Sequence, residues 1–167
     1  MLERLKRLLR GDPRPVDRIV EHPVLGTLSY SEDNDAWLTD PETAACGFGF
    51  YVAGDRAPEH ERICPDPMLL EHAAALARDP DAIRAKVAAH LASHPPSLNE
   101  LRRAGADHPP VTDTSSLKIY RICLMWPDRP NDGEIELRVS FSDKRFWVCS
   151  YVDRSPAHAV AYGGMDI

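Results

Sequence analysis

The sequence predicts an α+β fold: an antiparallel β-sheet from N- and C-terminal segments, with an inserted helical hairpin packed on one face. Residues 134–141 (EIELRVSF) alternate polar and apolar side chains with the period of two that is typical of a half-buried strand. Residues 20–55 contain further strand-like runs between polar turns. Asp-Pro pairs at 66–67 and 79–80 place a capping acid before a proline, which indicates two helix starts between these β regions.

The chain length of 167 residues suits one domain, 1–167, able to bury roughly 70% of the surface that its unfolded chain exposes. We expect an N-terminal helix at 1–11, a β region at 20–55, a helical insert at 66–105 and a β-meander at 117–163. The first helix follows from a leucine stripe at helical spacing, which Gly11 and a nearby proline end.

Three strand-like runs make up the β region. They cover 23–30, 36–39 and 47–53, and the polar residues 31–35 form a turn between the first two. Two glycines, Gly47 and Gly49, weaken the third run and indicate a bulge there.

The helical insert follows with a different periodicity. Helices are expected near 67–77 and 80–94, and Pro95-Pro96 stop the second. A third short helix starts at Ser97, where Ser-Leu-Asn-Glu has the spacing of a capping box, and it ends at Gly105.

The C-terminal meander pairs the apolar run 119–126 with the alternating strand 134–141. Asn131-Asp132-Gly133 lie between them and tolerate the left-handed backbone that a tight connection requires. The alternation places Leu137 and Val139 on the buried face, with Ile135 and Phe141 on the same face.

The net charge of −6 is concentrated in one part of the chain. Residues 20–66 hold two basic and ten acidic residues, a local balance of −8. This acidity argues against nucleic acid as a partner, because phosphate binding requires a basic surface. It suits a basic protein partner. The candidate contact residues surround the first turn and its exit: Glu32, Asp33, Asp35, Asp40 and Glu42.

Two histidines form the strongest metal-like pattern. His90 and His94, spaced i, i+4 on the second helix, point the same way as a pair of zinc ligands can. They also fall on the stripe of Ile83 and Val87, which is typical of a core-facing helix surface, and no third ligand stands at a characteristic spacing. The sequence therefore assigns no metal or other cofactor and no catalytic residue. The four cysteines form no CxxC pair, and we expect reduced thiols.

Two segments show a resemblance to a known group of proteins. Residues 22–28 (HPVLGTL), followed by Trp37 and Gly54-Asp55, resemble the N-terminal hairpin of a group of bacterial domains of unknown function. Residues 117–122, then 136–143 and Phe146, resemble their C-terminal meander. The resemblance covers about a third of the chain and implies an α+β domain without catalytic residues.

Some members of this group are thought to be immunity proteins of bacterial polymorphic-toxin systems. Members often carry a Gly-His pair where this chain has Val148-Cys149, so no role of that histidine is transferred. We therefore expect a non-catalytic protein-binding domain, an immunity-type inhibitor of a basic toxin.

Two alternatives remain open. One is a small metal-dependent hydrolase that uses His90 and His94. The other is a scaffold or adaptor that acts through self-association. No stretch approaches the ~20 apolar residues of a membrane span, and the N-terminus lacks the apolar core of a signal peptide, so we expect a cytoplasmic protein.

Overall fold

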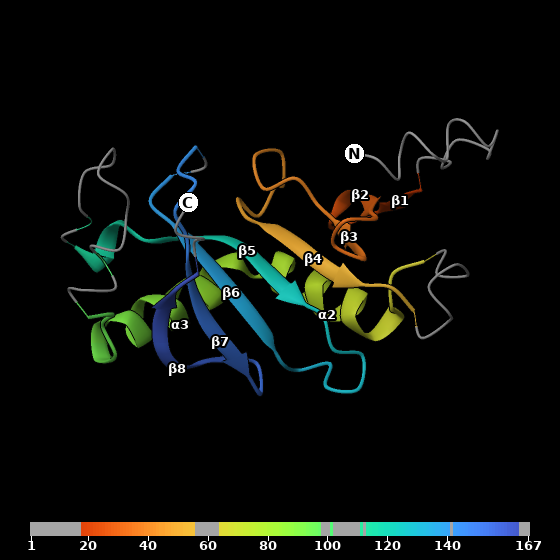
Figure 1. The fold of residues 1–167 in the computed structure, drawn as a ribbon. Helices are drawn as coiled ribbons and strands as arrows, with labels where there is room; N and C mark the ends of the chain where they lie inside the picture. The colour runs from red at the N-terminus through yellow and green to blue at the C-terminus, as the bar shows by residue number, and fades with distance from the viewer. Residues whose placement is uncertain are drawn as a thin grey trace.

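The fold is α+β, with a mostly antiparallel sheet. A computed structural model describes residues 18–55, 64–97, 101, 111, 113–140 and 142–163 (Figure 1). In these residues the strands form one eight-stranded sheet with the order β1-β2-β3-β4-β5-β6-β7-β8. Segments from the N-terminal and C-terminal parts of the described chain therefore contribute to one sheet, as the sequence predicts.

The N-terminal part of the sheet is an antiparallel meander. Its strands are β1 (Ile19–His22), β2 (Gly26–Ser31), β3 (Ala36–Leu38) and β4 (Gly49–Ala53). The last three match the predicted runs in place, and β1 was not predicted. Gly26 has φ of +73°, a left-handed conformation that glycine adopts without strain and that allows the β1–β2 turn.

Two helices follow β4, and both start where their Asp-Pro pairs predict. They are α2 (Pro67–Arg78) and α3 (Pro80–Ser93). The carboxylate of Asp66 accepts hydrogen bonds from the backbone N–H groups of Met68 and Leu69, at 2.9 and 3.1 Å. The carboxylate of Asp79 caps α3 through the N–H of Ala82 at 3.2 Å.

The C-terminal half of the sheet is the expected meander. It consists of β5 (Lys118–Leu124), β6 (Gly133–Arg138), β7 (Trp147–Val152) and β8 (Ser155–Tyr162), with a short 3₁₀ helix, η2 (Thr114–Ser116), before β5. A Cβ atom at Gly133 would overlap the carbonyl oxygen of Cys123, so the β5–β6 pairing requires glycine at this position.

Strand β6 ends at Arg138, earlier than the predicted strand 134–141. Beyond it the chain turns, with the Asp143 N–H bonded to the Ser140 carbonyl at 3.2 Å. Leu137 is fully buried as predicted, whereas Val139 is only partly buried and packs at the margin of the core.

One strand pair departs from the expected antiparallel arrangement. β4 and β5 run parallel, with Phe50 opposite Ile122 and Val52 opposite Leu124. A parallel pair requires a long crossover, and here α2, α3 and the segment after them connect the two strands. The insertion of helices between the two β regions therefore explains the parallel pair.

The main core lies between the sheet and the helices, which lie on one face of the sheet (Figure 1). Phe50, Ile122 and Leu137 on the central strands are fully buried in one apolar cluster with Leu69 of α2 and Ile83 of α3. At roughly 1.5–3 kcal/mol for each large apolar side chain removed from water, this cluster is the main favourable contribution to folding.

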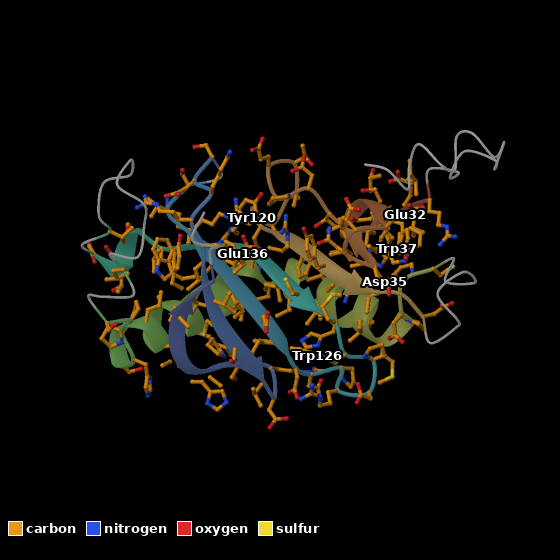
Figure 2. The ribbon with its side chains drawn as sticks, viewed as in Figure 1. Glu32, Asp35, Trp37, Tyr120, Trp126 and Glu136 are labelled. Atoms are coloured by element: carbon orange, nitrogen blue, oxygen red, sulfur yellow. The ribbon has the colours of Figure 1, made fainter. Side chains whose placement is uncertain are left out.

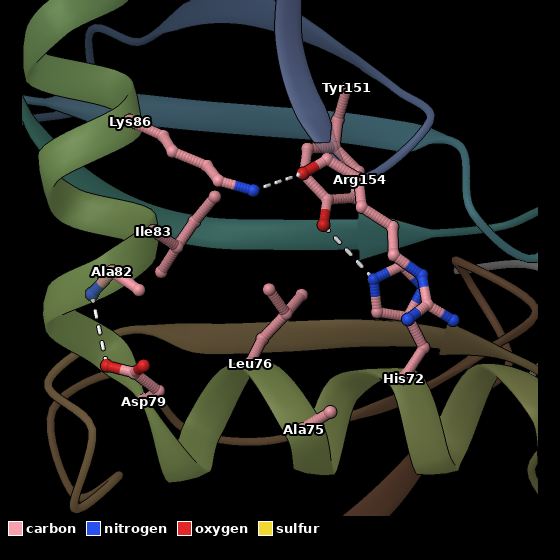
Figure 3. Close-up of a pocket in the computed structure, with 9 residues that line it drawn as sticks. All are labelled: His72, Ala75, Leu76, Asp79, Ala82, Ile83, Lys86, Tyr151 and Arg154. Atoms are coloured by element: carbon pink, nitrogen blue, oxygen red, sulfur yellow. Dashed lines mark hydrogen bonds between the residues drawn. The ribbon is translucent and has the colours of Figure 1, made fainter.

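Two predicted elements are not established. The proposed N-terminal helix at 1–11 and most of the third helix at 97–105 lie outside the described residues. α2 and α3 are separated only by Asp79, but they run in different directions (Figure 3), and a hairpin of side-by-side helices is not confirmed.

Candidate functional site

The β2–β3 hairpin presents the first three candidate acids. Glu32 and Asp33 are exposed at its turn. Asp35, at the end of the turn, has φ of +46°, and its carboxylate accepts a 2.6 Å hydrogen bond from the Tyr30 hydroxyl. Asp35 therefore has a structural role in the turn, and Glu32 and Asp33 are the acids that the hairpin presents to solvent.

The other two acids are at the opposite end of β3. Asp40 and Glu42 lie in the β3–β4 connection, and both are exposed. The backbone N–H of Glu42 donates to the Asp40 carboxylate at 3.0 Å, which stabilises the local turn. Because β3 separates this connection from the β2–β3 turn, the five acids form two groups along the strand.

An aromatic pair links the two strands of the hairpin. The rings of Tyr30 and Trp37 are 5.5 Å apart between centroids, and Trp37 is buried (Figure 2). The guanidinium of Arg18 lies 5.1 Å from the centre of the Tyr30 ring. These contacts stabilise the hairpin that carries Glu32 and Asp33.

The candidate metal ligands His90 and His94 stack on each other. Their ring centroids are 4.8 Å apart with 19° between the planes. His90 Nε2 donates to the carbonyl oxygen of His158 at 2.7 Å, and His94 Nδ1 is 3.0 Å from the Ser93 hydroxyl. In the part of the chain that the structure describes, no group of three or more His, Cys, Asp or Glu side chains could hold a metal ion.

A cluster of charged and aromatic side chains lies on the sheet face away from the helices (Figure 2). Glu136 is at its centre. It faces away from the helices, as the strand alternation predicts, but it is buried. Its carboxylate contacts Arg121 Nη1 at 3.4 Å and Arg138 Nη2 at 2.6 Å. The guanidinium of Arg121 lies 3.8 Å from the centre of the Tyr51 ring, and that of Arg138 lies 3.7 Å from that of Tyr120.

This polar cluster is largely shielded from water. The side chains of Arg121, Glu136 and Arg138 are 14, 11 and 18% exposed. Stacked rings and opposite charges replace much of the lost hydration, although the buried Arg121 Nε has no hydrogen-bond partner among the described residues. The cluster therefore fits a structural role on that face.

A small cavity of about 170 Å³ lies between α2, α3 and the end of β7 (Figure 3). His72 and Tyr151, both buried, form its polar wall. His72 Nδ1 donates to the Pro130 carbonyl at 2.6 Å, and its Nε2 lies 3.1 Å from the Tyr151 hydroxyl. The sequence did not identify this pair, because 79 positions separate the two residues.

Burial keeps the potential nucleophiles on β5 and β7 protonated. It raises the pKa of the Cys123 thiol and that of the Tyr151 phenol each to about 12, and it also raises the pKa of Cys149. Burial lowers the pKa of His72, so its ring stays neutral. A thiol or phenol reacts as its anion, and these environments disfavour the anion.

The cysteines and helices add two further observations. Cys46, Cys64, Cys123 and Cys149 are free thiols in the structure. Within the described ranges, no helix is both long and apolar enough to cross a membrane.

The chain was compared with known proteins. No protein-family model, curated protein or solved structure matches it.

Proposed function

We propose that this chain is a non-catalytic protein-binding domain, an immunity-type inhibitor of a basic bacterial toxin. The observation that carries the proposal is the exposed acidic turn of the β2–β3 hairpin, with Glu32 and Asp33 on a hairpin whose two strands are linked by the Tyr30–Trp37 pair. A basic partner would meet this turn first, and Asp40 and Glu42 would extend the contact along β3.

The chemistry of the interior supports binding over catalysis. The Cys123 thiol and the Tyr151 phenol are held in their protonated forms. Nε2 of His90 donates to the His158 carbonyl and is therefore not available to bind a metal ion, which weakens the alternative of a hydrolase built on His90 and His94. The observations therefore favour a binding role.

A hairpin variant without its two exposed acids tests this role. The full chain and its Glu32→Gln/Asp33→Asn variant would each be immobilised and exposed to a lysate of the bacterium that carries the gene. The matched control is Asp128→Asn/Asp153→Asn, which removes the same charge from exposed positions in the β5–β6 connection and the β7–β8 turn. Asn tolerates the left-handed φ of +48° at Asp153.

The expected result is a basic protein, identified by mass spectrometry, that binds to the wild type and the control but is depleted on the hairpin variant. Capture of no basic protein, or equal capture by all three chains, would contradict the proposed function. Thermal melts that agree between the three chains would show that each is folded.

A further inference from the structure

The two edges of the sheet differ in how they are protected against pairing with a further strand. On the β8 edge, Pro156 has no N–H to donate, and His158 has a left-handed φ of +61° and a carbonyl that already accepts a hydrogen bond from His90. The β1 edge lies at the other end of the sheet (Figure 1). It contains no proline, and its register with β2 is continuous from Ile19 to His22. β1 is therefore the edge that is open to pairing.

The hydrogen bonds of β1 show which of its backbone groups face this edge. The Tyr30 N–H donates to the Arg18 carbonyl at 2.9 Å, so these two residues form a hydrogen-bonded pair. Such pairs alternate with open ones along an antiparallel ladder, so Val20 directs its N–H and C=O toward β2, whereas Ile19 and Glu21 direct theirs away from it. Among the described residues, no hydrogen bond reaches these outward backbone groups.

The side chains of β1 indicate what an added strand would contain. Val20 lies opposite Leu28 and packs against the core, so a residue paired with Val20 would continue the apolar layer. Ile19 and Glu21 project to the other face, where Ile19 is 55% exposed and Glu21 is also exposed. A basic side chain beside them would pair with the Glu21 carboxylate and cover Ile19 with its apolar stem. A matching strand therefore alternates apolar and basic residues.

The charge around this edge favours a basic segment over a second copy of the chain. Because Tyr30 pairs with Arg18, the β2–β3 turn begins beside the N-terminal end of β1. One end of an added strand would lie next to the exposed acids Glu32 and Asp33, whichever way it runs. In a pair of β1 edges from two copies, Glu21 and the acidic turn of each copy would repel those of the other.

We propose that the basic partner inferred above contributes an extended segment of alternating apolar and basic residues, which pairs with β1 as a ninth strand of the sheet. The backbone groups of Ile19 and Glu21 form the hydrogen bonds, and the acidic side chains select a basic segment. This binding mode rests on the proposed function and adds to it: the β2–β3 turn attracts the partner, and the β1 edge holds it.

The probe is a synthetic peptide, acetyl-Lys-Val-Lys-Val-Lys-Val-Lys-amide, titrated into the isotope-labelled full chain and followed by two-dimensional NMR. A control peptide with proline in place of each valine has the same charge but cannot form a strand.

Two substitutions at one position separate the backbone contribution from the charge. Glu21→Ala removes the carboxylate, and Glu21→Pro removes the carboxylate and the outward N–H. Because that N–H bonds nothing in β2, proline is compatible with this edge of the native sheet. Ile19→Ala and Ile19→Pro form a second pair of variants if Glu21→Pro does not fold.

Saturable shifts are expected, largest at the amides of Ile19 and Glu21, with a Kd on the order of 1 mM for a few backbone hydrogen bonds. The affinity of Glu21→Pro for the valine peptide should be about tenfold or more below that of Glu21→Ala, because proline removes a donor and blocks the adjacent pairing. The proline peptide should bind the wild type with an affinity about tenfold or more below that of the valine peptide.

Four results would overturn the inference. One is the absence of saturable shifts in β1 at ~5 mM valine peptide. Another is equal affinity for the two peptides, which would indicate charge attraction alone. The third is equal affinity of folded Glu21→Ala and Glu21→Pro. The fourth is a shift of the β1 amides on dilution of the chain alone, which would assign the edge to a second copy.

The lysate capture separates this binding mode from the proposed function. If the captured basic protein is depleted on Glu32→Gln/Asp33→Asn but binds equally to Glu21→Ala and Glu21→Pro, the β1 contact is wrong and the proposed function stands. If no basic protein is captured, the proposed function fails, whereas the peptide titration still decides whether β1 accepts a basic strand.

Discussion

At the scale of single residues, Glu136 shows how far a strand pattern determines a side chain's surroundings. The alternation of β6 correctly places Glu136 opposite the face of Leu137. It cannot show that Arg121 and Arg138 close over the carboxylate, because Arg121 comes from the neighbouring strand. Burial of an outward-facing acid therefore depends on tertiary contacts that the sequence pattern does not contain.

Glu136→Ala should lower the free energy of unfolding by about 3 kcal/mol, because it leaves two shielded guanidinium groups without their carboxylate. Glu134→Ala is the control, since it removes an exposed acid from the same strand at a cost within about 0.5 kcal/mol. Urea unfolding of both variants gives the comparison. Equal losses would mean that the ion cluster contributes little to stability.

His72 should make stability depend on pH. Burial holds the pKa of His72 below its value of about 6.5 in the unfolded chain. The stabilisation from neutral His72 is therefore complete above about pH 6.5 and is lost as the pH falls toward the lowered native pKa, because the unfolded chain takes up the proton first.

His72→Gln should flatten the acid side of the stability curve relative to the wild type. Urea melts between about pH 7 and pH 5 provide the measurement, with the exposed-histidine variant His94→Gln as the control. Parallel curves for wild type and His72→Gln would contradict this account of His72.

At the scale of elements, the sequence predicted those features that contacts between neighbouring residues determine, such as the helix starts. The Asp-Pro pairs placed α2 and α3 to within a residue at their starts, because the cap is formed by neighbours in sequence. β1 and β8 were harder to identify. β1 has only four residues, and β8 contains Pro156, a register shift opposite Val148 and Ser150, and a left-handed His158. These irregularities interrupt the alternation that indicates a strand.

The two helix caps should differ in strength. Asp66→Ala should cost about 1–2 kcal/mol and Asp79→Ala about 0.5–1 kcal/mol, because Asp66 is buried and accepts two backbone N–H groups while Asp79 accepts one. Thermal melts of the two variants give the difference. A larger loss of stability in Asp79→Ala than in Asp66→Ala would show that burial of the capping residue does not determine which cap is stronger.

Leu137→Ala tests the inward face of β6. Its side chain is fully buried, so truncation should cost about 2–5 kcal/mol. Val139→Ala, beyond the end of the strand and only partly buried, should cost clearly less. If Leu137→Ala melted at the same temperature as the wild type, this result would contradict the burial of Leu137 on the face of β6 that packs against the helices.

At the scale of the whole molecule, the sequence identified both halves of the sheet but not the way they join. The parallel β4–β5 pair arises because helices intervene between these strands, and no local pattern in Phe50 or Ile122 specifies that direction. The spatial arrangement of the acidic residues could not be predicted from the sequence either. Sequence proximity grouped Glu32 with Asp40, whereas β3 extends between the turns that carry them.

We propose that the β2–β3 turn attracts a basic protein. The most direct measurement is the association rate constant of the captured partner with wild type and with Glu32→Gln/Asp33→Asn, at about 0.1 M and about 1 M salt. Screening shortens from about 10 Å to about 3 Å between these conditions. At low salt the wild type should associate with the partner faster than the variant does, and at high salt its association rate should fall markedly. The variant should associate slowly at both salt concentrations. Equal association rates for both chains at both salt concentrations would contradict the claim.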